Sequence, residues 1–135
     1  MPVTTLQLDS DTWDLVVSLD ANIATVNDVE GMQQSQDAAS ACRLFLDELW
    51  FDTTQGVPYW QQMLGKLPPI SLIESNYATA AETVTNVKAA SVTVTSLQNQ
   101  PPNSALRFHQ HRTVTGTVTV TGTTSTGSVT GTASF

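Results

Sequence analysis

Charged side chains are scarce in this sequence, and basic ones most of all. Only 13% of the residues are charged, and five Lys and Arg stand against twelve Asp and Glu. Ten of the acids lie within residues 1–52, where Arg43 is the one basic residue, whereas residues 53–135 carry a small positive excess. Binding to nucleic-acid phosphates needs clustered Lys and Arg, so we expect no nucleic-acid partner. The acidic half is compatible with docking against basic protein surfaces.

Cysteine and long apolar runs are also nearly absent. The single cysteine, Cys42, excludes an internal disulfide, and we interpret it as a small buried hydrophobe rather than a reactive thiol. No run approaches the roughly 18–20 apolar residues of a membrane span, and the first residues lack the pattern of a signal peptide. We therefore expect a soluble protein made in a cytoplasm, with no membrane partner. At 135 residues the chain has the length of one domain.

The residues that are present first indicate a helix in the middle of the chain. Apolar residues recur there at helical spacing, at Ala38, Ala41, Cys42, Phe45 and Leu49. Ser35 is suited to cap such a helix, which predicts a start between Ser35 and Asp37. We predict an end near Trp50 or Phe51, because the residues that follow are turn formers.

The loop after this helix is unusually apolar. A fixed backbone and two large rings follow a glycine turn, in the run Gly56, Val57, Pro58, Tyr59 and Trp60. This composition predicts a loop that is held in a core or an interface. We favour closure of the core by Tyr59 and Trp60 slightly over direct contact with a partner, and both interpretations stay open.

The other elements complete an α+β pattern. Short β-type runs at 13–17 and 22–26 flank turn residues and predict an N-terminal hairpin. A second helix is predicted from Ile70 or Ser71 to about Val84, closed by Asn86, and a strand over 89–97. We expect a small mixed or antiparallel sheet with an N-terminal hairpin, two helices packed on it and a C-terminal β-hairpin. One domain would span 1–121, and 122–135 would form a Thr/Gly/Ser-rich tail.

The clearest β pattern lies near the end of the chain, over 113–121. Threonines alternate there with apolar residues, without proline or charge. An uncovered strand of this kind is an aggregation hazard, so we predict that a partner strand covers it. The predicted pairing edge is Val114, Thr115, Gly116, Thr117, Val118, Thr119, Val120 and Thr121. For the tail we favour a flexible terminus over a strand donated to a neighbouring protein.

Residues suited to catalysis or metal binding are dispersed. Asp47 and Glu48 are adjacent on the predicted helix and would point about 100° apart, and Glu74 and Glu82 stand alone. Acidic residues cluster near the N-terminus, but their positions do not fit a calcium-binding EF-hand loop. His109 and His111 could reach one metal from a strand, although a solvated surface fits them better. We predict no enzymatic activity, no cofactor and no metal site.

The centre of the chain resembles a known family. A helix ending in Glu-Leu-Trp-Phe, then the run from Asp52 to Tyr59, then the segment from Trp60 to Gly65, are similar to the small baseplate wedge proteins of contractile-tailed phages. The Mu-like branch of this lysozyme-like wedge family is the most similar, and the family also includes the sheath-associated baseplate subunit of type VI secretion. Further similar segments bring the match to most of 6–121: 11–15, 22–24, 72–75 and 112–116. The chain departs from the wider family at 84–88, where a Glu-Pro-Arg type motif is replaced by Val-Thr-Asn-Val-Lys.

The resemblance implies a structural role in a virion. It implies an α+β domain in the tail baseplate wedge, assembled in the host cytoplasm within a six-fold hetero-assembly. The implied partners are other wedge proteins, tail sheath subunits and tube or hub proteins, with sheath assembly started by β-strand pairing. Two alternatives stay open, a cell-wall glycan hydrolase and a fibre-attachment or adhesin module built on the Thr-rich end.

Overall fold

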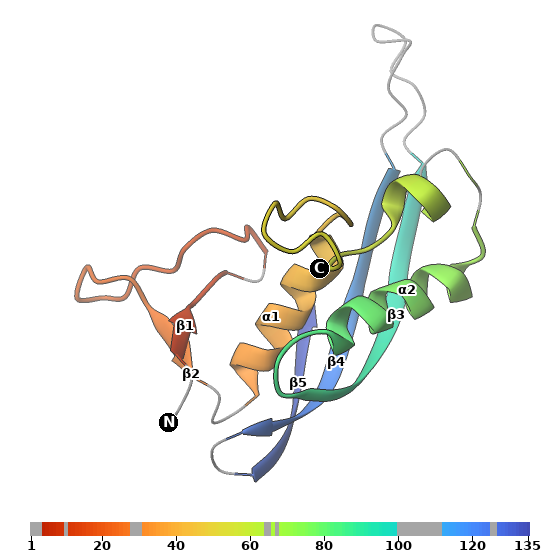
Figure 1. Cartoon of the computed structure of the whole chain (residues 1–135). Coiled ribbons are helices and arrows are strands. Elements are labelled where there is room, and N and C mark those ends of the chain that lie inside the picture. The colour runs from red at the N-terminus through yellow and green to blue at the C-terminus, as the bar shows by residue number, and fades with distance from the viewer. Residues whose placement is uncertain are drawn as a thin grey trace, which may run out of the picture.

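The computed structural model describes residues 4–9, 11–27, 31–63, 66, 68–99, 112–124 and 127–135. Its elements in chain order are β1 (Thr4–Leu6), β2 (Thr25–Asn27), α1 (Met32–Arg43), the single π-helical turn η1 (Tyr59–Met63), α2 (Ile70–Glu82), β3 (Val87–Asn99), β4 (Arg112–Thr124) and β5 (Gly127–Ser134). Strands β3, β4 and β5 form one antiparallel sheet in that order, and β1 and β2 form a small second one. Helices α1 and α2 lie on one face of the larger sheet (Figure 1). The predicted α+β fold is therefore confirmed.

The two faces of the larger sheet follow the sequence alternation. Val92, Val118 and Val120 are buried on the helix side of the sheet. The neighbouring threonines Thr93 and Thr117 are exposed on the other side. Since side chains alternate across a strand, the Val/Thr pattern places the apolar face against the helices.

The core lies between this valine face and the two helices. Tyr77 of α2 is its largest fully buried side chain, with 2% of its surface exposed. Around it are packed Met63 of η1 and small or β-branched residues from both helices, the loop after α1, and the sheet: Ala38, Ala39, Cys42, Val57, Ile73, Ala80, Ala81, Val92, Val118 and Val120. The small alanines let the helices approach the sheet closely.

Helix α1 is displaced from its predicted bounds at both ends. It begins at Met32, three residues before Ser35, after Gly31 adopts a left-handed conformation with φ 72°. Ser35 is inside the helix, where its hydroxyl donates to the Met32 carbonyl at 3.0 Å, so the predicted cap is wrong. The helix ends at Arg43, because Leu44 is extended and Asp47 has a positive φ of 69°. The predicted end near Trp50 is therefore also wrong.

The N-terminal hairpin is found in a reduced form. The predicted turn closes through the Ser18 N–H, which donates to the Asn22 carbonyl at 2.7 Å. Val17 and Ile23 form an isolated bridge next to this turn, and Leu15 of the first predicted run bridges to Leu8 instead of to the second run. Regular pairing instead joins β1 with β2, where Thr4 faces Asn27. The end of the second predicted run therefore forms β2, and the rest of the two runs forms an irregular loop between β1 and β2.

Helix α2 and the turn after it agree closely with the prediction. The helix begins at Ile70 after Pro69 and ends at Glu82, two residues before the predicted end. Asn86 then takes a left-handed conformation, with φ 70°, and its carbonyl accepts from the Thr123 N–H at 2.8 Å. Asparagine tolerates this conformation better than most residues, which explains its place between helix and strand.

The two interpretations of the tail, a flexible terminus and a strand donated to a neighbour, are wrong for residues 127–134. Residues 127–134 form β5, which pairs with β4 of the same chain rather than with a neighbour. Gly131 allows this strand to pass against α1, because a Cβ there would collide with the Gly31 carbonyl oxygen. Phe135 follows the strand and stacks edge-on against Tyr77, with ring centroids 4.9 Å apart. Composition alone did not reveal this close approach or the packing of Phe135 against Tyr77.

No helix among the described residues is long and apolar enough to cross a membrane.

Candidate partner-binding site

The predicted pairing edge lies inside the sheet. Strand β4 pairs with β3 from Arg112 to Gly122 and with β5 from Thr117 to Thr124. Gly116 also exchanges two backbone hydrogen bonds with Phe135, of 3.3 and 3.1 Å. The interpretation of residues 114–121 as an edge open to a partner is therefore wrong for residues 116–121. The physical reason is β5, which occupies the side of β4 that we expected a foreign strand to fill.

The outer edge of β3 is covered by acidic side chains. The Val94 N–H donates to Glu74 Oε1 at 3.0 Å, and the Ala90 N–H donates to Glu82 Oε1 at 3.3 Å. Both glutamates come from α2, eight residues apart on the helix beside this strand. Carboxylates that occupy outward N–H groups block the positions a foreign strand would need.

At Thr130 and Thr132 on the outer edge of β5, no carboxylate from the described part of the chain takes the place that Glu74 and Glu82 take on β3. In an antiparallel sheet every second pair of facing residues is joined by backbone hydrogen bonds. Because Gly116 and Phe135 form such a pair, Val118–Ala133 and Val120–Gly131 are hydrogen-bonded pairs as well. The backbone groups of Thr130 and Thr132 must then point away from β4. Among the residues that the structure describes, no hydrogen bond is recorded for these outward groups, and both side chains are exposed.

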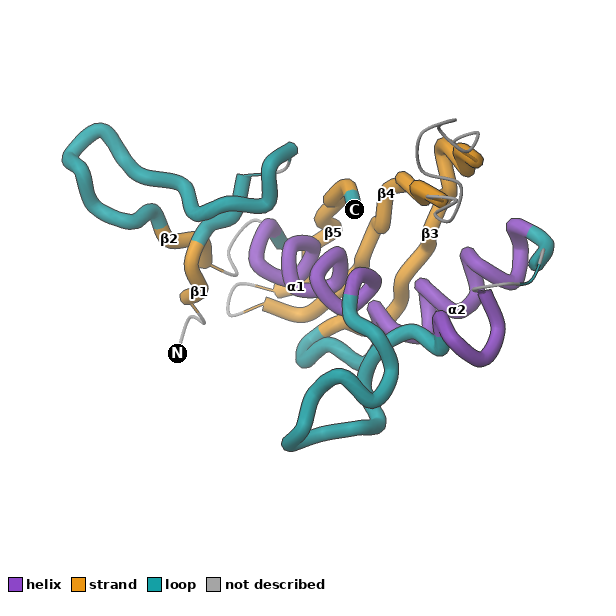
Figure 2. The backbone as a smooth tube through the Cα atoms, turned by 90° about the horizontal axis from the view of Figure 1, so that it is seen from above, coloured by secondary structure: helices purple, strands orange, loops and turns teal. Residues whose placement is uncertain are grey.

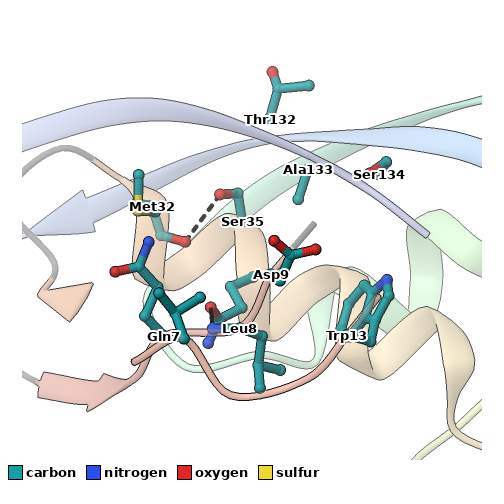
Figure 3. Close-up of a pocket in the computed structure, with 11 residues that line it drawn as sticks. Gln7, Leu8, Asp9, Trp13, Met32, Ser35, Thr132, Ala133 and Ser134 are labelled. Atoms are coloured by element: carbon teal, nitrogen blue, oxygen red, sulfur yellow. Dashed lines mark hydrogen bonds between the residues drawn. The ribbon is translucent and has the colours of Figure 1, made fainter. Parts of the chain in front are cut away.

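A cavity lies beside the end of this edge. It has a volume of about 380 Å³ and is lined by α1, by the N-terminal segment and by β5. Figure 3 shows Ala133 pointing into it from β5, toward Ser35 of α1, with Leu8 and Trp13 on the opposite wall. A strand added beside β5 would place alternate side chains over this hollow.

Two side chains of α1 hold the N-terminal wall of the cavity. The Gln36 amide donates to the Leu6 carbonyl at 2.8 Å and accepts from the Leu8 N–H at 2.9 Å, as a neighbouring strand would. The Arg43 guanidinium lies 4.4 Å from the centre of the Trp13 ring. The turn before Trp13 is closed by Asp9, whose pKa is lowered by hydrogen bonds from the Thr12 and Asp11 backbone and the Thr12 hydroxyl.

The second predicted site, Gly56 to Trp60, divides between core and surface. Val57 is fully buried, and its N–H donates to the Leu44 carbonyl at 2.8 Å. The Tyr59 hydroxyl donates to the Cys42 carbonyl at 2.5 Å and lies 3.1 Å from the Tyr77 hydroxyl. Pro58 is half-buried between Val57 and Tyr59. Trp60 is 69% exposed, with its ring against Phe45.

Burial keeps the ionisable groups of this cluster neutral. Burial and the Tyr77 hydroxyl raise the pKa of Tyr59, and burial raises the pKa of the Cys42 thiol to about 12. Cys42 also donates weakly to the Tyr77 carbonyl at 3.5 Å. A thiol with such a pKa is a poor nucleophile, which favours the interpretation of Cys42 as a buried hydrophobe.

Sequence analysis missed an exposed aromatic pair. Trp50 and Phe51 are 89% and 67% exposed, and their rings meet edge to face with centroids 5.6 Å apart. We had assigned them to the end of a helix, where one face would be covered. A possible signal was their position directly before the turn that starts at Asp52, since large rings seldom precede a surface turn without a role.

The acids do not converge on a catalytic arrangement in the described part of the chain. Glu74 and Glu82 are bonded to the backbone of β3, and Asp52 closes its own turn by accepting from Thr54 and Gln55. No group of three or more His, Cys, Asp or Glu side chains that could hold a metal occurs among the residues searched, which are the described ones. His109 and His111 lie outside the described residues.

Comparison with known proteins adds no assignment. No protein-family model matches the chain, and no curated protein is significantly similar to it.

Proposed function

We propose that this protein is a non-enzymatic structural component of a contractile-tail baseplate wedge. It would help to start sheath assembly by accepting a strand from a sheath subunit at the outer edge of β5. The partners would be other wedge proteins, sheath subunits and tube or hub proteins in a six-fold assembly in the virion. The resemblance of the central segment, from Glu48 to Gly65, supports this family of functions, and the α+β fold is the one that the resemblance implies.

The observation that carries the proposal is the difference between the two sheet edges. The β3 edge is covered by Glu74 and Glu82, whereas the β5 edge presents the outward backbone groups of Thr130 and Thr132. In strand addition the main chain provides affinity and pockets for alternate side chains provide specificity. The cavity next to Ala133 offers such a pocket at the end of the open edge. We therefore propose β5, and no longer β4, as the strand that pairs with the partner.

A proline at the open edge tests this proposal. Thr132→Pro removes an outward N–H and places a ring in the path of a foreign strand, while edge strands tolerate proline where the N–H faces solvent. We expect the variant to stay folded, with its free energy of unfolding changed by about 1 kcal/mol or less. In tails assembled with this variant, we expect sheath to be largely absent.

The matched control is Thr132→Ser, which keeps the backbone N–H and the hydroxyl. Circular dichroism of both purified variants establishes that they are folded, and electron microscopy of the assembled tails counts those that carry sheath. Normal sheath in tails that contain the folded proline variant would contradict strand addition at β5. Purified tails that lack the wild-type chain altogether would contradict the baseplate role itself.

A further inference from the structure

The exposed pair Trp50 and Phe51 belongs to a loop, residues 44–57, that leaves the end of α1. This loop projects from the helix side of the molecule, away from the larger sheet (Figure 2). Trp50 and Phe51 are exposed together with their rings in contact, and contiguous exposed apolar patches with polar residues around them mark interaction sites. Trp and other aromatics are also enriched among the residues that dominate the energy of protein interfaces.

The loop is held in shape at its base. The Leu46 N–H donates to the Val57 carbonyl at 2.9 Å, and the Val57 N–H donates to the Leu44 carbonyl at 2.8 Å. Gly56, with φ 109°, lies so close to the Phe45 backbone that a Cβ would come within 2.6 Å of it. The two ends of the loop are therefore fixed together by the protein core.

The tip of the loop is also organised before any partner arrives. The Phe45 N–H donates to Glu48 Oε2 at 2.9 Å on one side of the aromatic pair. On the other side, Asp52 accepts from the Thr54 hydroxyl at 2.6 Å and from the Gln55 amide at 2.7 Å. Fixing these turns beforehand reduces the conformational entropy that is lost when the rings are bound.

The surroundings of the pair indicate the charge of its partner. Asp47, Glu48 and Asp52 flank the two rings in sequence, and Asp47 and Glu48 are exposed. Hydrogen bonds from Thr54 and Gln55 lower the pKa of Asp52, so it is ionised at neutral pH. We propose that Trp50 and Phe51 insert into an apolar pocket of another protein whose rim carries Lys or Arg, the charge complement of these acids.

Other occupants fit the geometry less well. The two ring planes stand at 89°, so they do not form the flat platform on which a sugar ring would stack. Three acids next to the rings would be repelled by anionic lipid headgroups. A second copy of this chain has a formal net charge of −7 and five basic residues in all, which makes it a poor source of a basic rim.

This inference rests on the proposed function, because the expected pocket belongs to another component of the baseplate. The test places the photo-reactive amino acid benzoyl-phenylalanine at position 50 or 51 in the full chain, and assembles it into tails. Mass spectrometry then identifies the cross-linked peptides. We expect cross-links to a different tail protein, at apolar residues with Lys or Arg nearby in the sequence or structure of that protein.

Cross-links only between copies of this chain, to surfaces without basic residues, or to no protein at all would overturn the inference while leaving the baseplate role intact. Tails that do not contain the chain would overturn both. Glycan or lipid adducts in place of protein would assign the pair to one of the two occupants rejected above, and would also overturn it.

Substitutions give a second, quantitative readout. The double variant Trp50→Ala with Phe51→Ala should lower incorporation of the chain into tails by at least about tenfold, with thermal unfolding unchanged because both side chains are exposed. Asp47→Asn removes one of the acidic charges beside the aromatic pair, and asparagine tolerates the positive φ at this position. We expect incorporation to fall by about two- to fivefold at low salt, with less effect at high salt. The control Leu19→Ala removes an exposed apolar side chain elsewhere. Equal incorporation of the double variant and this control would contradict the inference.

Discussion

The two outer edges of the β3-β4-β5 sheet have the same backbone groups to offer but differ in what surrounds them. Along β3, Glu74 and Glu82 reach down from α2 and accept from the outward N–H groups. Along β5, the neighbouring helix α1 contributes no such carboxylate among the described contacts, and a cavity lies beside the strand. The comparison teaches that availability for strand addition is decided by side chains on the neighbouring helix, and not by the strand sequence itself.

The largest expected effect comes from removing β5 from its place. Gly131→Val would force a branched side chain against the Gly31 carbonyl and Ser35. We expect a loss of about 3 kcal/mol in the free energy of unfolding, because neither backbone can move away without disturbing α1. Urea unfolding measures this loss. The control Thr130→Val lies in the same strand with its side chain exposed and should change stability little. A similar loss of stability in both variants would show that the packing of β5 against α1 does not depend on Gly131.

A somewhat smaller effect is expected at the end of β5. Phe135→Ala removes the ring that stacks on Tyr77 and covers Gly116. Because the ring is only partly buried, we expect a loss of about 2 kcal/mol, together with faster amide exchange in Gly116. Thermal unfolding and hydrogen exchange measure the two effects. An unchanged exchange rate at Gly116 would contradict the role of Phe135 in fastening this strand.

Removing the glutamates that cover the outward N–H groups of β3 should make this edge as available for strand pairing as the edge of β5. The double variant Glu74→Ala with Glu82→Ala removes the acceptors from Val94 and Ala90, and we expect a loss of about 1–2 kcal/mol in stability. We also expect self-association, because the freed edge is rich in β-formers and carries no cover. Analytical ultracentrifugation detects it, with Asp20→Ala as a control for the lost negative charge. If the double variant stays monomeric at the concentrations at which the control does, the glutamates do not protect this edge.

The smallest expected effect concerns acid and the cavity wall beside β5. The pKa of Asp9 is lowered by hydrogen bonds from the Thr12 and Asp11 backbone, so its contribution to folding is present above its unfolded pKa and is lost as the pH falls through the lower folded pKa. Protonation should therefore weaken the contacts of Asp9 with Asp11 and Thr12 without unfolding the core. An NMR titration should show the Thr12 amide responding below the ordinary pKa of an aspartate, and in Asp9→Asn this response should vanish. An unaltered response in that variant would assign the titration to another acid.

The sequence predicted those parts of the fold in which one local pattern dominates. The alternation of valine and threonine in β4 and the helical spacing of α2 each survived folding, because tertiary contacts reinforced the local preference. The bounds of α1 could not be derived, since Gly31 replaced a side-chain cap and the chain beyond Arg43 left the helix to pair Phe45 with Val57. Propensity does not report such long-range contacts.

The candidate site was less predictable than the fold. The Thr/Gly/Ser-rich segment after Gly122 has little apolar surface, and its order depends on two features visible only in three dimensions: the fit of Gly131 against α1 and the seat of Phe135 on Tyr77. Once β5 is in place, β4 becomes internal from Gly116 onward, which is why the predicted edge was wrong for residues 116–121. The protection of β3 by Glu74 and Glu82 was equally hidden, because it depends on which face α2 turns to the strand.

Site-resolved amide hydrogen exchange of Thr130 and Thr132, in the isolated chain and in assembled tails, tests the account most directly. Both outward amides should exchange rapidly in the isolated protein and at least about a hundredfold more slowly in the tail, while Val118 and Val120, which are bonded to β5, should be slow in both. Equally rapid exchange of Thr130 and Thr132 in the two states, in tails that contain the chain, would contradict the addition of a strand at this edge.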